Sequence, residues 1–138
     1  MLDLIEIAKI ADEYVFDNNE DLIKQAKSIK ALPGCNVRET IVRTPDYEIV
    51  LVKWEGVSRS PMHIHQRHDE LGRSTSIVYI LEGSLLEERQ IGDKTSLVVL
   101  KRLMDPVIIP STESHEVTSL ENSITVNIYS PPAYNKAV

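Results

Sequence analysis

The sequence contains one cysteine, Cys35, and neither a basic leader nor an apolar run long enough to cross a membrane. A single cysteine cannot form an intramolecular disulfide, which agrees with a reducing compartment. We therefore expect a cytoplasmic protein. Cys35 is interpreted as a small apolar or turn residue rather than a nucleophile.

Basic residues are too few for a nucleic-acid-binding surface. The 138 residues include 21 acidic and 15 basic side chains, which gives a formal net charge of −6. Nucleic acids and anionic membranes attract an excess of lysine and arginine that this chain lacks, so we expect neither as a partner. The length suffices for one domain with a substantial core and is too short for two.

Helical periodicity is confined to the first 36 residues. Apolar residues recur at helical intervals over residues 2–15, where Asp3 can cap the first turn. A second helical pattern covers residues 19–31 and is ended by Pro33-Gly34. Two short helices are therefore predicted in this N-terminal segment.

The pattern changes to β-strands after residue 36. β-Branched and aromatic residues form short runs separated by turn residues, with no helix between them. This predicts an all-β sandwich or barrel over residues 37–138, and a polar loop over residues 66–73. The predicted strands are residues 40–43, 47–54, 74–81, 85–90, 96–100, 107–109 and 124–129.

Three of the four histidines form a pattern suited to a metal site. His63 and His65 are two residues apart, so on an extended strand they point to the same face. His115 can supply a third ligand from another strand. A lone histidine is more often a surface or core residue, but the β segments around these three favour convergence on one metal. Imidazole binds iron, zinc, copper and nickel, so the ligands alone do not select the metal.

The motifs around these histidines resemble the cupin superfamily. Gly56 is followed after six residues by His63-Ile64-His65, and Gly83 closes the strand that comes next. The second motif covers residues 110–115. This resemblance implies a mainly β fold, the cupin-type barrel or jelly roll, also called a double-stranded β-helix, with a short N-terminal helical segment.

Within the cupins, the chain resembles the thiol dioxygenases typified by cysteine dioxygenase. The resemblance covers roughly residues 38–132, and its marks are Arg38 upstream of Trp54, the string Leu81-Glu82-Gly83-Ser84-Leu85 with Glu87 following, and the closing Tyr129-Ser130-Pro131-Pro132. It implies iron(II) held by His63, His65 and His115, with zinc or nickel as alternatives in the purified protein. In this family both atoms of O2 are added to a thiol sulfur, which gives a sulfinic acid.

The resemblance also assigns residues to the substrate. Arg38 matches the arginine that binds the substrate carboxylate, although it is otherwise a surface residue on an edge strand; Arg43 and Arg59 are the alternatives. Tyr129 matches the tyrosine beside the iron, whose hydroxyl binds substrate or oxygen, and is otherwise a core or rim residue. Asn127 stands where the family has a histidine that orients this tyrosine, and asparagine cannot become a cation.

A fourth metal ligand is an open alternative. Many cupins add a glutamate, and counting back from Gly83 places Ser76 at that position, whereas counting forward from His65 places Glu70 there. The count from Gly83 follows a continuous strand and favours a site of three histidines, with Glu70 as a solvated loop charge. Ser76 also replaces the cysteine that some animal members crosslink to the tyrosine, so that crosslink cannot form.

The sequence thus predicts an iron(II)-dependent thiol dioxygenase acting on cysteine or a related mercapto-acid. The alternatives are a metal-dependent cupin of other chemistry, such as carbon oxidation or isomerisation, and a non-catalytic cupin that binds a small molecule. The expected partners are a small thiol and O2. The chain is expected to be a monomer or a homodimer.

Overall fold

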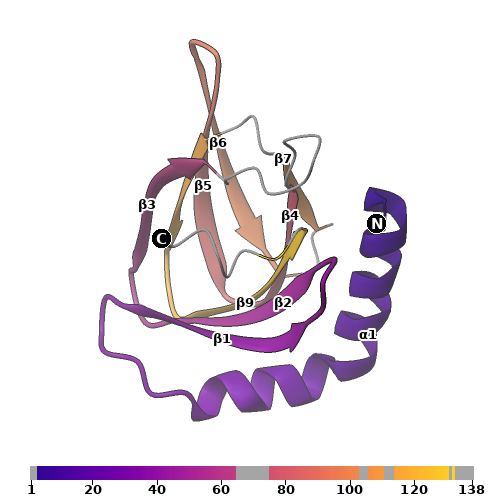
Figure 1. Cartoon of the computed structure of the whole chain (residues 1–138). Coiled ribbons are helices and arrows are strands. Elements are labelled where there is room, and N and C mark those ends of the chain that lie inside the picture. The colour runs from indigo at the N-terminus through magenta and orange to yellow at the C-terminus, as the bar shows by residue number, and fades with distance from the viewer. Residues whose placement is uncertain (1–2, 65–74, 103–105, 111–113, 131, 133–138) are drawn as a thin grey trace.

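The computed structural model describes residues 3–64, 75–102, 106–110, 114–130 and 132. These residues form one helix followed by nine strands in two sheets that face each other (Figure 1). The mainly β architecture with an N-terminal helical segment is as predicted. The elements are α1 (Leu4–Ser28), β1 (Asn36–Arg43), β2 (Glu48–Trp54), β3 (Arg59–Ile64), β4 (Thr75–Glu82), β5 (Ser84–Ile91), β6 (Lys94–Lys101), β7 (Val107–Pro110), β8 (Ser114–Ser119) and β9 (Ser123–Ser130).

Each sheet consists of antiparallel strands, and the chain crosses from one sheet to the other several times. One has the strand order β1-β2-β9-β4-β7 and the other has the order β3-β8-β5-β6. The chain passes from the first sheet to the second between β4 and β5, at Gly83. Gly83 has φ +87°, and a Cβ there would lie 2.2 Å from Ser123 Oγ, so only glycine allows the two segments to approach so closely.

The N-terminal segment is a single helix, so the prediction of two helices was wrong. Asp17-Asn18-Asn19 interrupts the helical pattern in the sequence, but it contains neither proline nor glycine, and α1 continues through it. Figure 1 shows that α1 bends midway. Asn18 Nδ2 donates to the Tyr14 carbonyl over 2.8 Å, a contact that competes with the helical hydrogen bond and accounts for the bend. No helix in the described part of the chain has the length and apolar character to span a membrane.

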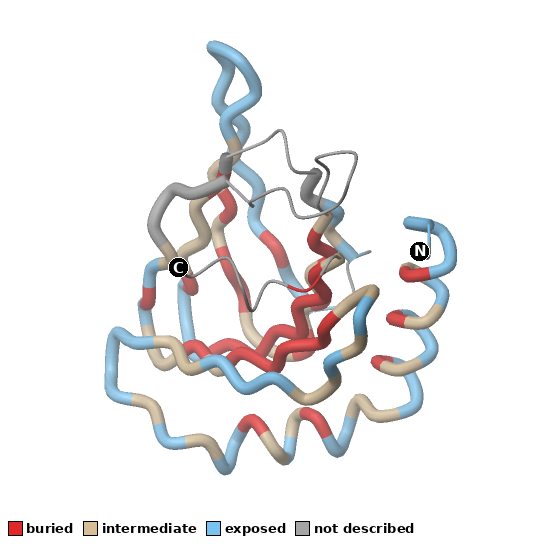
Figure 2. The backbone as a smooth tube through the Cα atoms, viewed as in Figure 1, coloured by how far each residue is buried: buried red, intermediate tan, exposed pale blue. Residues whose placement is uncertain are grey.

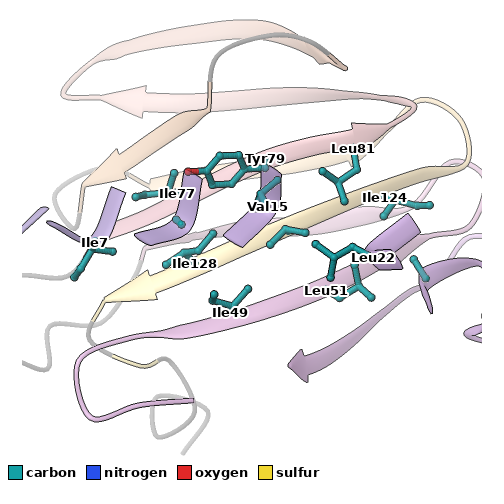
Figure 3. Close-up of a cluster of buried hydrophobic side chains, with 13 residues drawn as sticks. Ile7, Val15, Leu22, Ile49, Leu51, Ile77, Tyr79, Leu81, Ile124 and Ile128 are labelled. Carbon is teal, nitrogen blue, oxygen red and sulfur yellow. The ribbon is translucent and has the colours of Figure 1, made fainter. Parts of the chain in front are cut away.

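One stripe of α1 packs against the outer face of the five-stranded sheet (Figure 3). The sheet side comes from β2, β4 and β9, and in Figure 2 the buried positions of α1 lie on the side turned toward it. Tyr79 on β4 adds a hydrogen bond to Asp12 on α1. The buried residues are Ile7, Ala11, Val15, Leu22 and Ala26 of α1, with Ile49, Leu51, Ile77, Tyr79, Leu81, Ile124, Val126 and Ile128 of the sheet.

The seven predicted strands are present, and two further strands, β3 and β8, were missed. β3 contains Pro61 and polar residues, which weaken a strand prediction. It lies at an edge of its sheet, where proline is tolerated. β8 is short and contains one apolar residue, Val117, so it lacks the apolar alternation by which a strand is recognised. The predicted loop at residues 66–73 lies outside the described residues.

Candidate functional site

A cavity lies between the two sheets, on the face of the five-stranded sheet opposite α1. Successive residues of a strand face opposite sides, so β9 packs its even-numbered residues against α1 and turns its odd-numbered ones toward the cavity. The five-stranded sheet contributes Arg38, Trp54, Ser76, Val78, Ile80, Thr125, Asn127 and Tyr129, and the four-stranded sheet contributes Ser60, Leu85, Glu87, Leu100, His115 and Val117.

The strand register brings two of the predicted metal ligands to neighbouring positions. β3 pairs with β8, and His63 stands directly opposite His115. Positions directly opposite one another in an antiparallel pair lie on the same face of the sheet. His115 is 4% exposed and lines the cavity. The side chain of His63, and the whole of His65 and Glu70, lie outside the described part of the chain.

His115 is held by a buried carboxylate on the neighbouring strand. Its Nδ1 lies 3.3 Å from Oε2 of Glu87, whose other oxygen accepts from Arg89 over 2.9 Å. Burial alone would raise the pKa of Glu87, but the hydrogen bond with His115 and the charge of Arg89 outweigh burial and lower that pKa. An ionised carboxylate only accepts, so Nδ1 of His115 carries the hydrogen, and in a neutral imidazole Nε2 then has the lone pair that a metal requires.

Arg38 and Tyr129 meet on the opposite wall of the cavity. Arg38 donates from one guanidinium nitrogen to the Tyr129 hydroxyl over 2.6 Å, and both residues line the cavity. The two alternative arginines are placed elsewhere. Arg43 contacts Glu48 at 3.3 Å, and the largely exposed Arg59 pairs with Glu116 at 2.8 Å. Among these three arginines, only Arg38 is part of the cavity wall.

Asn127 belongs to a chain of hydrogen bonds that ends at Tyr129. Trp54 Nε1 donates to Thr125 Oγ1 over 3.1 Å, and Thr125 Oγ1 donates to Asn127 Oδ1 over 2.9 Å. Asn127 Nδ2 then donates to the Tyr129 hydroxyl over 3.1 Å. These hydrogen bonds are shielded from water, because Thr125, Asn127 and Tyr129, which are alternate residues of β9, are all buried.

Ser76 faces Tyr129 across the β4–β9 pair. The two residues are direct partners in the register, and Ser76 is 1% exposed. The structure therefore brings together the two positions that the family resemblance pairs. A serine there offers a hydroxyl beside the tyrosine and cannot form a thioether with it.

Sequence reasoning missed two functional features of this cavity. The contacts of Glu87 with His115 and Arg89 were not predicted, although Leu85, Glu87 and Arg89 alternate along one strand and so share a face. Charged residues at inward-facing positions of a strand were the available signal. The indole of Trp54 was also not linked to Asn127, because the two are far apart in the sequence and their connection depends on how β2 pairs with β9.

No protein-family model and no curated protein matches the chain. Several solved structures are similar. KdgF from Halomonas sp. is 25% identical, with 75% of this chain and 84% of that chain covered at a TM-score of 0.60. An RmlC-like cupin from Shewanella frigidimarina is 17% identical, with 80% and 88% covered at a TM-score of 0.62.

A protein with a double-stranded β-helix domain from Klebsiella pneumoniae is likewise 17% identical, with 76% of this chain and 80% of that chain covered at a TM-score of 0.61. None of the three names refers to a thiol dioxygenase. The similarity therefore concerns the fold. The chain has the cupin fold, a double-stranded β-helix preceded by a helix.

Proposed function

We propose that the protein is an iron(II)-dependent thiol dioxygenase that oxidises a small carboxylate-bearing thiol to its sulfinic acid. The proposal depends most on one arrangement: Arg38 and Tyr129 are hydrogen-bonded on one wall of the cavity, and His115 lies on the other wall. A carboxylate held at the first wall would leave the thiol end of a short molecule to reach toward His115. Cysteine and 3-mercaptopropionate both have this form.

Arg38 suits a carboxylate ligand. It makes no ion pair with any carboxylate among the described residues, and its guanidinium donates a hydrogen bond to the Tyr129 hydroxyl. A guanidinium presents a planar set of donors that can hold a carboxylate through two parallel hydrogen bonds, which a lysine cannot do. An arginine in a partly apolar cavity that pairs with no carboxylate in the described part of the chain therefore favours an anionic ligand.

The residues present fit a metal ion bound by imidazoles. A carboxylate that accepts from Nδ1 of a histidine is the usual support of a metal-binding imidazole, and Glu87 does this for His115. The ligands would be His63, His65 and His115, with the first and third opposite one another in the strand register. When bound, iron(II) would supply the site at which thiolate and dioxygen meet, and three neutral imidazoles leave its charge to favour an anionic thiolate.

Tyr129 and Asn127 would act at the substrate end. The Tyr129 hydroxyl lies within hydrogen-bonding distance of Arg38 and Asn127 and can bind the carboxylate or the oxidised sulfur group. Asn127 supports the tyrosine without titrating, because an amide has no ionisable form near neutral pH. The pH dependence of the activity should therefore contain no contribution from the ionisation of residue 127.

Oxygen uptake by the anaerobically iron-loaded protein tests the reaction directly. The substrates are L-cysteine, 3-mercaptopropionate, mercaptosuccinate and cysteamine, with mass spectrometry of the products. We expect uptake with one or more of the carboxylate-bearing thiols and a product that has gained two oxygen atoms. Cysteamine has no carboxylate and should be the poorest substrate. Absence of uptake with every thiol, at full iron occupancy, would rule out the proposed reaction.

Replacement of a ligand tests the metal site separately. His115→Ala should abolish tight iron binding, measured by elemental analysis after purification with iron. His68→Ala is the matched control, because His68 is the one histidine outside the proposed ligand set. This variant should retain iron. Full iron occupancy in His115→Ala would remove this residue from the site.

A metal-dependent cupin of other chemistry is the second candidate. The similarity to KdgF, at 25% identity over 75% of this chain, concerns the fold and is compatible with this candidate as well. Under this alternative the protein would bind a metal and a carboxylate-bearing molecule without thiol-dependent oxygen uptake. A non-catalytic binding cupin would instead show ligand binding and no turnover of any compound that it binds.

A further inference from the structure

β6 is an edge strand with a regular backbone. It stands at the end of the four-stranded sheet, and all eight of its residues, from Lys94 to Lys101, pair with β5 without a shift of register. The turn between the two strands projects beyond the sheets in Figure 1 and is exposed in Figure 2. In the described part of the chain no strand pairs with the other side of β6, so its outward backbone groups form a regular row of donors and acceptors.

The other three edge strands have features that discourage pairing with another chain. β1 has a register shift between Thr40 and Val42. β3 has a shift between Ser60 and His63 and contains Pro61. β7 is only four residues long. Register shifts, proline and short length are common means by which proteins protect the edges of their sheets, and β6 has none of the three.

Three consecutive apolar residues in the middle of β6 are exposed. Leu97 is 63% exposed, and Val98 and Val99 are each 41% exposed. Leu97 and Val99 lie on one face of the strand and Val98 lies on the other, so apolar surface is exposed on both faces. An exposed, regular and apolar edge strand is a typical site for pairing with a further strand. A strand added beside β6 would cover part of this surface on each face.

We propose that β6 pairs with β6 of a second copy of this chain, antiparallel and about a two-fold axis at Leu97. The four-stranded sheets of the two copies would then form one continuous sheet, with the same surface used by both. This inference goes beyond the proposed function, because it requires neither a metal nor a thiol.

The charges around β6 favour a second copy as the partner. Asp93, in the turn before β6, comes four residues before Leu97, and Lys101 comes four residues after it. Antiparallel pairing about Leu97 brings each Asp93 level with Lys101 of the second copy and sets Thr95 opposite Val99. The seam then has apolar and β-branched contacts in its middle and opposite charges at both ends. Lys101 also interacts within its own chain, but an ammonium has three donor hydrogens and can serve both contacts.

Shifted registers are less favourable. Moving the axis by one residue, to Val98, would set Lys94 level with Arg102 of the second copy, and like charges opposite one another destabilise a strand pair. Moving it by two residues would set Leu97 opposite Lys101, an apolar residue against a charge. The axis at Leu97 avoids both mismatches.

Sedimentation of the full chain over a range of protein concentrations tests the pairing. We expect a species of twice the chain mass of 15.6 kDa, which dissociates on dilution. Leu97→Lys places two ammonium groups next to each other at the axis and should raise the dissociation constant of the dimer at least about tenfold. Val57→Lys is the matched control, because Val57 is a 66% exposed apolar residue outside β6. It should change that constant by less than about twofold.

Exchange of the end charges tests the register. Asp93→Lys and Lys101→Asp should each raise the dissociation constant of the dimer about tenfold, because each turns two opposite-charge contacts into like-charge ones. The double variant should return the constant to within about threefold of the unmodified protein. Within one chain the two residues are roughly 25 Å apart along the strand, so only a second copy can produce this recovery.

Each outcome supports or overturns the pairing. A single species of the chain mass at every concentration would overturn it, and so would a dimer that Leu97→Lys leaves intact. A double variant that dimerises no better than the single ones would overturn the axis at Leu97. Thermal unfolding checks that the variants fold.

Crosslinking is the second measurement if a charged variant does not fold. Cysteines opposite one another at the axis are close enough for a disulfide, so Leu97→Cys in a Cys35→Ser background should form a covalent dimer on oxidation. Val57→Cys in the same background should not. Absence of the crosslink would also overturn the pairing. None of these results depends on oxygen uptake, so the pairing and the proposed reaction can fail separately.

Discussion

Replacement of Glu87 by glutamine should weaken metal binding without removing a metal ligand. Glu87 accepts a hydrogen bond from Nδ1 of His115, and as a carboxylate it can only accept. Glutamine has almost the same shape, but its amide can also donate to Nδ1. His115 would then carry its hydrogen on Nε2, where no metal can bind. Changes of this kind typically reduce metal affinity by about 10–100-fold.

The same substitution should destabilise the metal-free protein. The side chains of Glu87 and His115 are 4% and 5% exposed, and that of Arg89 is 18% exposed. Removing one partner of a buried ion pair costs about 3–5 kcal/mol. Glutamine retains one acceptor oxygen and water can reach part of Arg89, so we expect a loss of about 2–3 kcal/mol in the free energy of unfolding. This corresponds to a urea midpoint lower by roughly 1–2 M.

Iron affinity by competition with a chelator, and urea unfolding, measure these two effects. Glu88→Gln is the control, because Glu88 is the next residue of β5 and its side chain lies on the opposite face of the sheet. Its partner in the strand register is Glu116. It should change the free energy of unfolding by less than about 0.5 kcal/mol and leave the iron affinity unchanged. Iron affinity in Glu87→Gln equal to that of the unmodified protein would refute the reasoning about the His115 tautomer.

Three further predictions concern the other wall of the cavity and the helix. Arg38→Ala should raise KM for 3-mercaptopropionate roughly tenfold or more and leave KM for cysteamine nearly unchanged, because only the first substrate has a carboxylate that can lose its charged hydrogen bond. Steady-state KM values that change equally for both substrates would reject the carboxylate contact. Tyr129→Phe should lower kcat on the order of tenfold or more at unchanged metal content, and an unchanged kcat would assign Tyr129 to packing. Burial, and then the hydrogen bond to Asp12, raise the pKa of Tyr79 above 10.0, so its stabilising contribution is complete below pH 10 and is lost as the pH rises further. Thermal unfolding should therefore show a smaller alkaline loss of stability in Tyr79→Phe, and an equal loss in both proteins would contradict this assignment.

The sequence predicted the fold well where local pattern and burial agree. β2 is a nearly continuous apolar run and β9 alternates apolar with polar residues, so both were recognised with almost their observed bounds. The helix was divided in two because Asp17-Asn18-Asn19 has low helical propensity. Packing outweighs that local preference, because Val15 and Leu22 on either side are buried in the same cluster against the sheet.

The candidate site was predictable only in part. Motifs identified Arg38, Tyr129 and His115, and the structure brings all three to one cavity. The partners of these residues were not predictable, because each comes from a strand distant in the sequence. Glu87 reaches His115 through the β5–β8 pair, and Trp54 reaches Thr125 through the β2–β9 pair. A one-residue change in either register would turn these side chains to the other face of the sheet.

β3 and β8, which carry His63 and His115, are the two strands that apolar alternation missed, and this has a physical cause. A strand is recognised by apolar alternation, but β3 turns Ser60 and β8 turns His115 toward a cavity instead of a packed core. Their pairing must then be supported by the surrounding structure. Ser119 at the end of β8 provides such support, because its hydroxyl accepts from the Ser58 backbone nitrogen over 2.8 Å and donates to the Gly56 carbonyl over 2.7 Å. The fully buried Ser119 thereby fixes the start of β3 against β8, and a register shift between Ser60 and His63 then sets His63 opposite His115.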